Sequence, residues 1–407
     1  MNINLPKNRS ELLQRLQEPL FKNSFCIMLS SISSAGFGFI FWMISAKLYP
    51  KEDVGIATAL ISSMLLLILL SRFGMDSSII RFIPGNNKNN IFSTSVIITT
   101  IFAVFFGAIF ILGIDIFSPE LKILKSPLNT IIFLGVLAAS SVTSITGTSF
   151  VAIRKAEYFL IQTFTSGSRI LFVIPLTALG AIGIFGAVGA SFLLALFIAI
   201  IHITKSDIKP TLGVDNKFLN EALHFSAGNY FAGLFMTAPS MILPIMVLNV
   251  VGAEQSACYY ISYAIAVVLF MIPNAISMSL FVEGCHGEAL KKTIMKSLLL
   301  ILIVLTPAVI LLCMGGHWIL GFIGADYATE GLTVLRIMAI SSFFVGLNSM
   351  YVSIKRIQND INEIIWISAL NAVMLLGLAY IFMQLYGIVG VGYAWIVSYT
   401  IAAIIIG

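Results

Sequence analysis

The residue best placed to do chemistry is an arginine inside an apolar segment. Arg169 lies near the middle of the stretch 158–180, in the run TFTSGSRILF. A charged side chain at that depth is costly, and it usually faces a wet cavity or a partner. Its guanidinium is suited to binding a phosphate with two parallel hydrogen bonds. Ser166, Gly167 and Ser168 make the surrounding face small and polar. The alternative is a buried ion pair or a helix-packing contact between spans.

A second group of charged side chains gathers where apolar segments end. Arg72 and Arg81 lie on either side of Asp76, and Arg154 follows another apolar segment. We expect these residues to form a cluster at the inner face of a membrane. The cluster is either an entry site for an anionic headgroup, with Asp76 orienting an arginine, or the ordinary excess of positive charge on the cytoplasmic side.

Two further polar residues lie within apolar segments. Arg336 is near the outer end of the segment 331–353. It lines the outer half of a cavity or extends to the membrane surface. Asn274 follows Pro273 in the middle of another segment. Its amide is suited either to sugar hydroxyls or to holding helices together.

Carboxylates are scarce in the apolar segments. Asp115, near the outer end of the segment 91–117, is the only one well within such a segment. A cation-coupled drug exporter needs an acid deep in the protein to bind H⁺ or Na⁺. Asp115 and Asp76 are weak candidates for that coupling, and the balance of charge favours an anionic cargo.

Composition excludes several classes of protein. The chain of 407 residues is 59% hydrophobic and only 10% charged, whereas soluble domains contain about 25% charged residues. A soluble enzyme, a nucleic-acid-binding protein and a disordered chain are therefore excluded. The four cysteines and four histidines are scattered singly, so neither a metal site nor a cofactor is expected. A polytopic helical membrane protein remains.

Twelve segments are long enough to cross a hydrocarbon core of about 30 Å. They are residues 24–46, 54–73, 91–117, 128–150, 158–180, 183–204, 225–250, 256–282, 297–315, 331–353, 363–385 and 388–407. Leucines at helical spacing before the first span predict an amphipathic segment on the membrane surface. The predicted organisation is an amphipathic segment 1–23, an N-terminal lobe 24–204, a cytoplasmic linker 205–224 and a C-terminal lobe 225–407. The last apolar run ends at Gly407, so the second lobe either stops at the inner face or is truncated.

The distribution of basic residues sets the orientation. With a cytoplasmic N-terminus, 17 of the 23 Lys and Arg residues fall in inner loops and four in outer loops, while Arg169 and Arg336 lie within spans. This asymmetry is typical of a protein of the cytoplasmic membrane. One miscounted span would exchange the inner and outer loops that follow it and remove the asymmetry. The asymmetry therefore also supports the count of twelve spans.

The two halves of the chain resemble each other. LYPKEDVG at 48–55 follows the first span, and VVGAEQSA at 250–257 follows the seventh. Each half contributes six spans, an even number, so both enter the membrane from the same side as parallel repeats. Two six-helix lobes with a seam between them are the architecture of a transporter that opens to one side at a time.

Three segments carry a resemblance to a known family. They are the runs AKLYPKEDVG at 46–55, FGMDSSIIRF at 73–82 and LGFIGADY at 320–327. Together with the span pattern they resemble the multidrug/oligosaccharidyl-lipid/polysaccharide exporter superfamily, in its polysaccharide and O-antigen flippase branch.

The resemblance implies an all-α fold with two lobes around a central cavity. It also implies passage of a polyprenyl-pyrophosphate-linked glycan across the membrane, with polysaccharide-assembly enzymes as possible partners. A cation-coupled multidrug exporter is the main alternative. A membrane-embedded glycan-processing enzyme is a further one, although the short outer loops and the lack of an HExxH motif argue against it.

The loop asymmetry predicts the sides on which reporters will lie. A reporter fused after Lys217 should be cytoplasmic, and one fused after Lys122 should be extracytoplasmic. Paired alkaline phosphatase and green fluorescent protein fusions measure this. Both reporters on the same side would contradict the span count and the parallel lobes.

Overall fold

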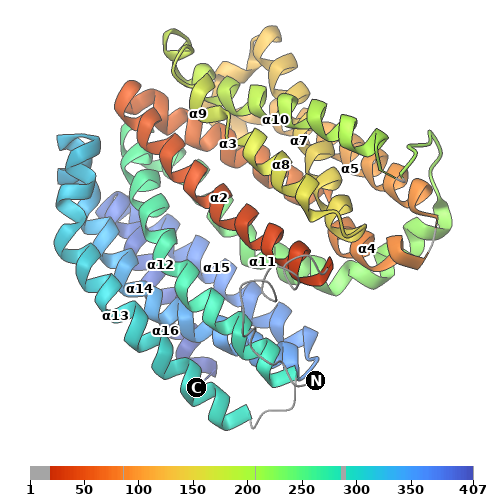
Figure 1. The fold of residues 1–407 in the computed structure, drawn as a ribbon. Coiled ribbons are helices and arrows are strands. Elements are labelled where there is room, and N and C mark those ends of the chain that lie inside the picture. Colours follow the sequence, from red (N-terminus) through yellow and green to blue (C-terminus); the bar gives the residue numbers. More distant parts are fainter. Residues whose placement is uncertain (1–18, 86, 207, 286–289, 407) are drawn as a thin grey trace, which may run out of the picture.

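The computed structural model describes residues 19–85, 87–206, 208–285 and 290–406, and all regular structure in these ranges is helical (Figure 1). The helices of the first half are α2 (Pro19–Leu48), α3 (Lys51–Ser71), α4 (Met75–Phe82), α5 (Lys88–Leu112), α6 (Ile114–Phe117), α7 (Pro127–Ala152), α8 (Ala156–Ser166), α9 (Arg169–Phe172) and α10 (Gly180–Thr204). Those of the second half are α11 (Asn216–Val251), α12 (Ala253–Cys285), α13 (Leu290–Ile323), α14 (Ala325–Ile357), α15 (Ile361–Tyr386) and α16 (Ile388–Ile406). Short 3₁₀ helices are η1 (Ile83–Gly85), η2 (Pro119–Lys125) and η3 (Thr177–Leu179).

The predicted all-α fold of a polytopic membrane protein is confirmed. Among the described residues, eleven helices are long and apolar enough to cross a membrane. The predicted amphipathic segment 1–23 lies outside the described residues except for its last five, which begin α2.

The fifth predicted span, residues 158–180, is not one continuous helix. It consists of α8, a turn at Gly167 and Ser168, the single turn of α9, a further turn and η3. Hydroxyls of Thr163 and Ser166 donate to the carbonyls four residues earlier, a bond that bends helices. Gly167 and Ser168 keep right-handed helical φ and ψ, so the break is one in the i→i+4 hydrogen bonding: the amide of Ser168 donates to the carbonyl of Thr165, and that of Ile170 to the carbonyl of Gly167. Such 3₁₀ geometry inside a helix often marks a functional hinge.

Two other predicted boundaries differ from the helix ends in the structure. The third span ends at Leu112 rather than at residue 117, because α5 stops at Gly113 and the chain turns into α6. The linker 205–224 is helical from Asn216 onward, because the side chain of Asp215 caps the amide of Phe218 and starts α11.

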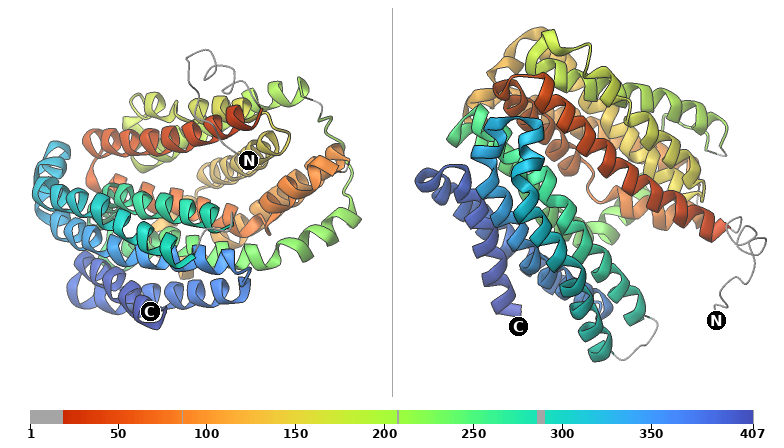
Figure 2. Two further views of the ribbon diagram at one scale, coloured as in Figure 1. Left: turned by 60° about the horizontal axis from the view of Figure 1, so that its bottom comes forward. Right: turned by 60° about the vertical axis from the view of Figure 1, so that its left-hand side comes forward.

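The helices form two groups. In Figures 1 and 2 the red-to-yellow helices of the first half lie on one side and the teal-to-blue helices of the second half on the other. We call α2–α10 the N-terminal lobe and α11–α16 the C-terminal lobe. The long helix α11 also packs against α3 and α4 of the first lobe.

A pair of glycine motifs shows that the lobes are built alike. Gly180 begins α10 with φ of +55°, and Gly387 directly precedes α16 with φ of +58°. This left-handed conformation favours glycine. Three residues later, a Cβ at Gly183 would lie 2.1 Å from the carbonyl oxygen of Leu176, and one at Gly390 would lie 2.2 Å from that of Phe382. The sixth helix of each lobe therefore starts with the same glycine-dependent turn.

The lobes meet tightly at the end that the basic residues assign to the outside. Lys51 Nζ lies 3.1 Å from Glu330 Oε1 across the boundary, and Gly55 touches the second lobe so closely that a Cβ there would lie 1.8 Å from the carbonyl oxygen of Ala253. The rings of Trp42 and Tyr260 are 4.7 Å apart. We call these contacts the outer closure.

Toward the other end, one face of α2 is left uncovered. Phe41 and Trp42 in the outer half of α2 are buried, whereas Phe25, Met28 and Ile32 in its inner half are 49–57% exposed. The lobes are thus held together at the outer end, and α11 with α4 supplies contact near the inner end through Ser78 and Ser226.

The outer closure predicts a specific cross-link. In a variant carrying Lys51→Cys and Glu330→Cys, the two thiols should form a disulfide or react with a short bifunctional reagent, because the native side chains touch. Cys258 should be changed to Ala, since its Sγ lies 3.4 Å from Glu330. Mass spectrometry after alkylation measures the cross-link.

The matched control pairs Lys51→Cys with Asp360→Cys. Asp360 lies beyond the opposite end of α14, a helix of 33 residues that is about 50 Å long. Equal cross-linking of the two pairs, or none at 51 and 330, would contradict the outer closure.

Candidate functional site

The broken span opens onto a cavity in the N-terminal lobe. The cavity measures about 860 Å³ and is lined by α2, α3, α4, α7, α8, α9 and α10, with Thr237 and Met241 of α11 on its remaining side. Its volume is in the range of small-molecule binding sites. The predicted cavity lay in the seam between the lobes, whereas this one lies mainly within the first lobe and borders the seam only at α11.

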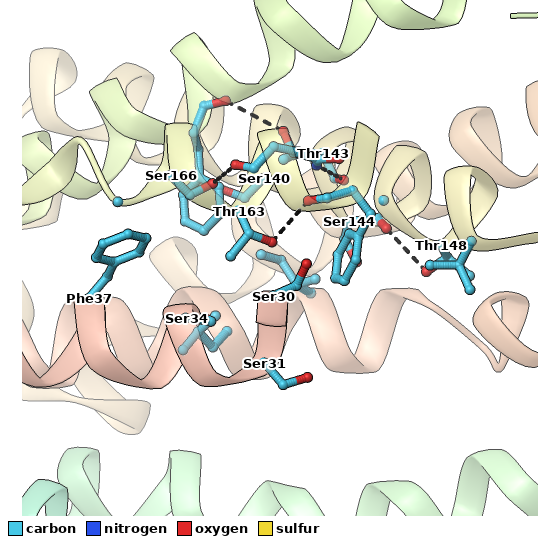
Figure 3. A pocket seen from close by; sticks show the side chains of 18 of the residues that line it. Ser30, Ser31, Ser34, Phe37, Ser140, Thr143, Ser144, Thr148, Thr163 and Ser166 are labelled. Carbon is cyan, nitrogen blue, oxygen red and sulfur yellow. Dashed lines mark hydrogen bonds between the residues drawn. The ribbon is translucent and has the colours of Figure 1, made fainter. Parts of the chain in front are cut away.

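Hydroxyl groups dominate the polar lining of this cavity. Ten serines and threonines contribute: Ser30, Ser31, Ser34, Ser140, Thr143, Ser144, Thr148, Thr163, Ser166 and Thr237. Figure 3 shows Ser30 and Ser34 of α2 opposite Thr163 and Ser166 of α8. Several of these hydroxyls donate their proton to the carbonyl four residues earlier, as Ser30 does to Cys26 at 2.7 Å. Their oxygens keep lone pairs free to accept hydrogen bonds from a ligand.

Two arginines supply the charge of the lining. Arg72 and Arg169 line the cavity, and its lining contains no aspartate or glutamate among the described residues. The site is therefore cationic and rich in hydroxyls. A multiply charged anion that also carries hydroxyl groups matches this surface.

Arg169 lies at the break, directly after the turn at Gly167 and Ser168. Its guanidinium carbon is 5.5 Å from the centre of the Phe41 ring, a cation–π arrangement. Its Nε is buried without a hydrogen-bond partner. In the part of the chain that the structure describes, no carboxylate lies within 4.0 Å of it. The described residues thus supply no partner for the ion pair that was one of the alternatives.

Arg72 forms an ion pair with Asp76. One of the two interpretations of the inner-face cluster expects this arrangement, in which Asp76 orients an arginine. Arg72 Nη1 lies 3.1 Å from Asp76 Oδ2. The other oxygen of Asp76 accepts a hydrogen bond of 3.3 Å from Thr148 of α7. The carboxylate therefore fixes the guanidinium from one side, while Arg72 Nε stays buried without a partner. Asp76 acts on the cavity through Arg72 and does not line it.

The remaining predicted residues lie elsewhere. Arg81 is exposed on α4, with its guanidinium carbon 4.1 Å from the centre of the Phe225 ring. Arg154 is exposed in the turn between α7 and α8, with φ of +58°. Arg336 is exposed, and its Nε donates to the carbonyl of Cys313 at 3.0 Å. None of these three residues lines the cavity of the first lobe.

Asp115 is not inside a span, contrary to the expectation. It lies in α6, past the end of α5, and forms ion pairs with Lys122 and Lys125. The hydrogen bond from Lys125 lowers the pKa of the Asp115 carboxyl below its usual value. An exposed, ionised and paired carboxylate beyond the end of a span is poorly suited to coupling ion flow to transport.

The sequence analysis did not single out the hydroxyl lining. The signal was present in the run AASSVTSITGTS at 138–149, where hydroxyls repeat at intervals of three and four residues. That spacing places Ser140, Ser144 and Thr148 on one face of a helix. Serine and threonine are also common where membrane helices pack, so only the cavity shows which face they line.

The fold is that of the transporters of the multidrug/oligosaccharidyl-lipid/polysaccharide (MOP) superfamily. An inward-facing multidrug resistance MATE family transporter of this superfamily aligns with a TM-score of 0.70 at 15% identity, covering 93% of this chain and 96% of that structure. The lipid II flippase MurJ in an inward closed conformation aligns with a TM-score of 0.74 at 15% identity, covering 93% and 86%. At this identity the likeness establishes the fold and nothing about cargo.

Within that fold, the sequence defines the family. Residues 20–281 match the polysaccharide biosynthesis protein family, and the chain belongs to it. A relative is the putative O-antigen transporter of Shigella flexneri, 25% identical over 188 residues. The match spans 44% of this chain and 45% of that relative.

Proposed function

We propose that this protein carries a glycan linked to a polyprenyl pyrophosphate from the inner to the outer leaflet of the cytoplasmic membrane. The observation that carries the proposal is Arg169, a cation at membrane depth that lines a cavity and has no carboxylate partner among the described residues. Such a charge is costly in a bilayer unless a ligand or water offsets it. A pyrophosphate supplies the missing anion.

The rest of the lining matches the other parts of this cargo. Hydroxyl oxygens with free lone pairs accept hydrogen bonds from sugar hydroxyls, and the two guanidinium groups donate to phosphate oxygens. The polyprenyl chain stays in the bilayer, so only the headgroup needs a polar passage. Membership of the polysaccharide biosynthesis family and the similarity to a putative O-antigen transporter support this choice of cargo.

Transport requires that the two lobes change their contacts. The outer closure around Lys51 and Glu330 blocks exit in the conformation described. We propose that it separates once the headgroup is bound, so that the cavity opens to the outer leaflet. The cytoplasmic N-terminus and the inner-membrane location are parts of the same proposal. The cargo is moved and not chemically altered.

The competing function is cation-coupled drug export, which shares the fold. An exporter of cationic drugs needs negative charge where the drug or the coupling ion binds. The cavity offers arginines and, among its described lining residues, no carboxylate. The charge of the lining therefore favours an anionic cargo.

Deletion of the gene tests the cargo. We expect the deletion strain to lose surface polysaccharide and to accumulate lipid-linked repeat units on the cytoplasmic leaflet, because headgroups cannot cross the bilayer unaided. Extraction and mass spectrometry of the lipid-linked glycans measure the accumulation. Normal surface glycan together with new sensitivity to cationic dyes would instead identify a drug exporter.

Substitution of Arg169 tests the proposed phosphate contact. Arg169→Lys keeps the charge but loses the planar fork, so transport should fall partially. Arg169→Ala should reduce transport by roughly 10- to 150-fold, since a hydrogen bond to a charged group contributes about 1.5–3 kcal/mol. Transport of the lipid-linked glycan and the melting temperature in detergent are measured together for the wild type and both variants.

The melting temperature separates binding from folding. Because no described carboxylate would be left unpaired, Arg169→Ala should melt close to the wild type. Breaking a buried ion pair would cost about 3–5 kcal/mol. Undiminished transport by Arg169→Ala would refute the phosphate role. A loss of transport that follows a collapsed melting temperature would assign the arginine to the fold instead.

A further inference from the structure

The C-terminal lobe contains a cavity of its own, in the place that corresponds to the cavity of the first lobe. The first cavity is lined by α2, α3, α7, α8 with α9, and α10, which supply spans one, two, four, five and six of their lobe, and in addition by Ile80 of α4 and by Thr237 and Met241 of α11. The second is enclosed by α11, α12, α14, α15 and α16, which supply the same spans of theirs. The two cavities are thus related by the internal duplication that the glycine motifs of α10 and α16 also show.

The chemistry of the second cavity differs from that of the first. No charged residue lines it among the described residues. Its polar lining consists instead of amides and hydroxyls: Asn274, Asn348, Ser349, Ser368, Asn371 and Tyr399. Amides both donate and accept hydrogen bonds, as sugar hydroxyls do. This lining suits an uncharged polyol and offers no positive charge to a phosphate.

The side-chain amide of Asn348 hydrogen-bonds between helices, whereas part of the amide of Asn371 has no partner. Asn348 donates to the carbonyls of Phe344 and Tyr399 and accepts from Asn371 at 2.9 Å. By contrast, Asn371 Oδ1 is buried without a hydrogen-bond partner. A buried acceptor left unpaired costs stability, and a ligand hydroxyl in the cavity would supply the missing donor.

The size and position of the cavity fit one sugar of the cargo. Its volume is about 150 Å³, and one water needs roughly 10–15 Å³ of such space, so it has room for on the order of ten waters. Asn274 is exposed and accepts a hydrogen bond of 2.6 Å from Ser349, which places the mouth of the cavity at α12.

Helix α11 lines both cavities. Thr237 and Met241 face the first cavity, and Met236 and Pro239 face the second. A helix is about 10 Å across, a distance that a short oligosaccharide spans.

We propose that the cavity of the C-terminal lobe binds a sugar of the glycan while the arginines of the N-terminal lobe hold the pyrophosphate. The duplicated architecture thus divides one headgroup between its two halves, with charge recognised in one and hydroxyls in the other. This inference rests on the proposed function, and it assigns to the second lobe the selection among glycans.

A binding experiment with two probes tests the division. The first probe is the lipid-linked intermediate isolated from the deletion strain, and the second is the same carrier lipid pyrophosphate without its glycan. We expect the purified wild type to bind the first at least about tenfold more tightly, the effect of two or three neutral hydrogen bonds. Asn371→Leu and Asn274→Leu should both abolish this difference and leave the affinity for the bare carrier unchanged.

Two further variants serve as references. Asn229→Leu changes an amide of α11 that lines neither cavity, and it should keep the preference for the glycan. Arg169→Ala should weaken the binding of both probes by the same factor. Unchanged affinity for the bare carrier also shows that a variant is folded.

The outcomes separate the two proposals. A preference for the glycan that persists in both Asn371→Leu and Asn274→Leu would overturn the sugar site, as would a wild type that binds both probes equally. A wild type that binds neither probe would instead refute the proposed cargo itself.

Discussion

The placement of one guanidinium inside a membrane is the constraint on which the rest of the site depends. Arg169 cannot lie against lipid, and the described residues give it no carboxylate. The structure surrounds it with an aromatic face at Phe41 and a hydroxyl-lined cavity. Directly before Arg169 the helix tightens from i→i+4 to i→i+3 hydrogen bonding at Gly167 and Ser168, and both Gly167 and Arg169 line the cavity.

The outer closure shuts one end of the space between the lobes. Lys51 of α3 pairs with Glu330 of α14 across the boundary between the lobes, and the contact of Gly55 with Ala253 leaves no room for a larger side chain. A polar cavity near the middle of the membrane is tolerable only if one end is shut, because a passage open at both ends would leak ions. The tight packing at one end and the uncovered face of α2 toward the other are therefore parts of one design.

Internal duplication explains how one chain presents two different surfaces. The glycine turns before α10 and α16 fix equivalent helices in both lobes, and each lobe encloses a cavity between the same spans. Arg72 and Arg169 line one cavity, and the amides of Asn274 and Asn371 line the other. Because the two lobes share a backbone arrangement but line their cavities with different side chains, the residues that bind charge and those that bind hydroxyls can be substituted independently.

The sequence by itself determined the class of fold, because apolar length and the scarcity of charge follow directly from the solvent that a membrane provides. It also singled out Arg169 as a charge at membrane depth, because a charged side chain within an apolar segment is visible in the sequence alone. It could not place Asp115 outside the membrane, because apolar residues continue past the end of α5 at Leu112. Nor could it show that Arg336 donates to the carbonyl of Cys313 and does not line the cavity of the first lobe.

Only the tertiary structure decided which hydroxyls and amides line cavities and which hold helices together. Serine, threonine and asparagine serve both purposes with the same side-chain atoms. The difference between Asn348, whose hydrogen bonds are made within its lobe, and Asn371, whose carbonyl is left without a donor, arises from which helices come together. Those contacts join residues far apart in the chain, and no local spacing encodes them.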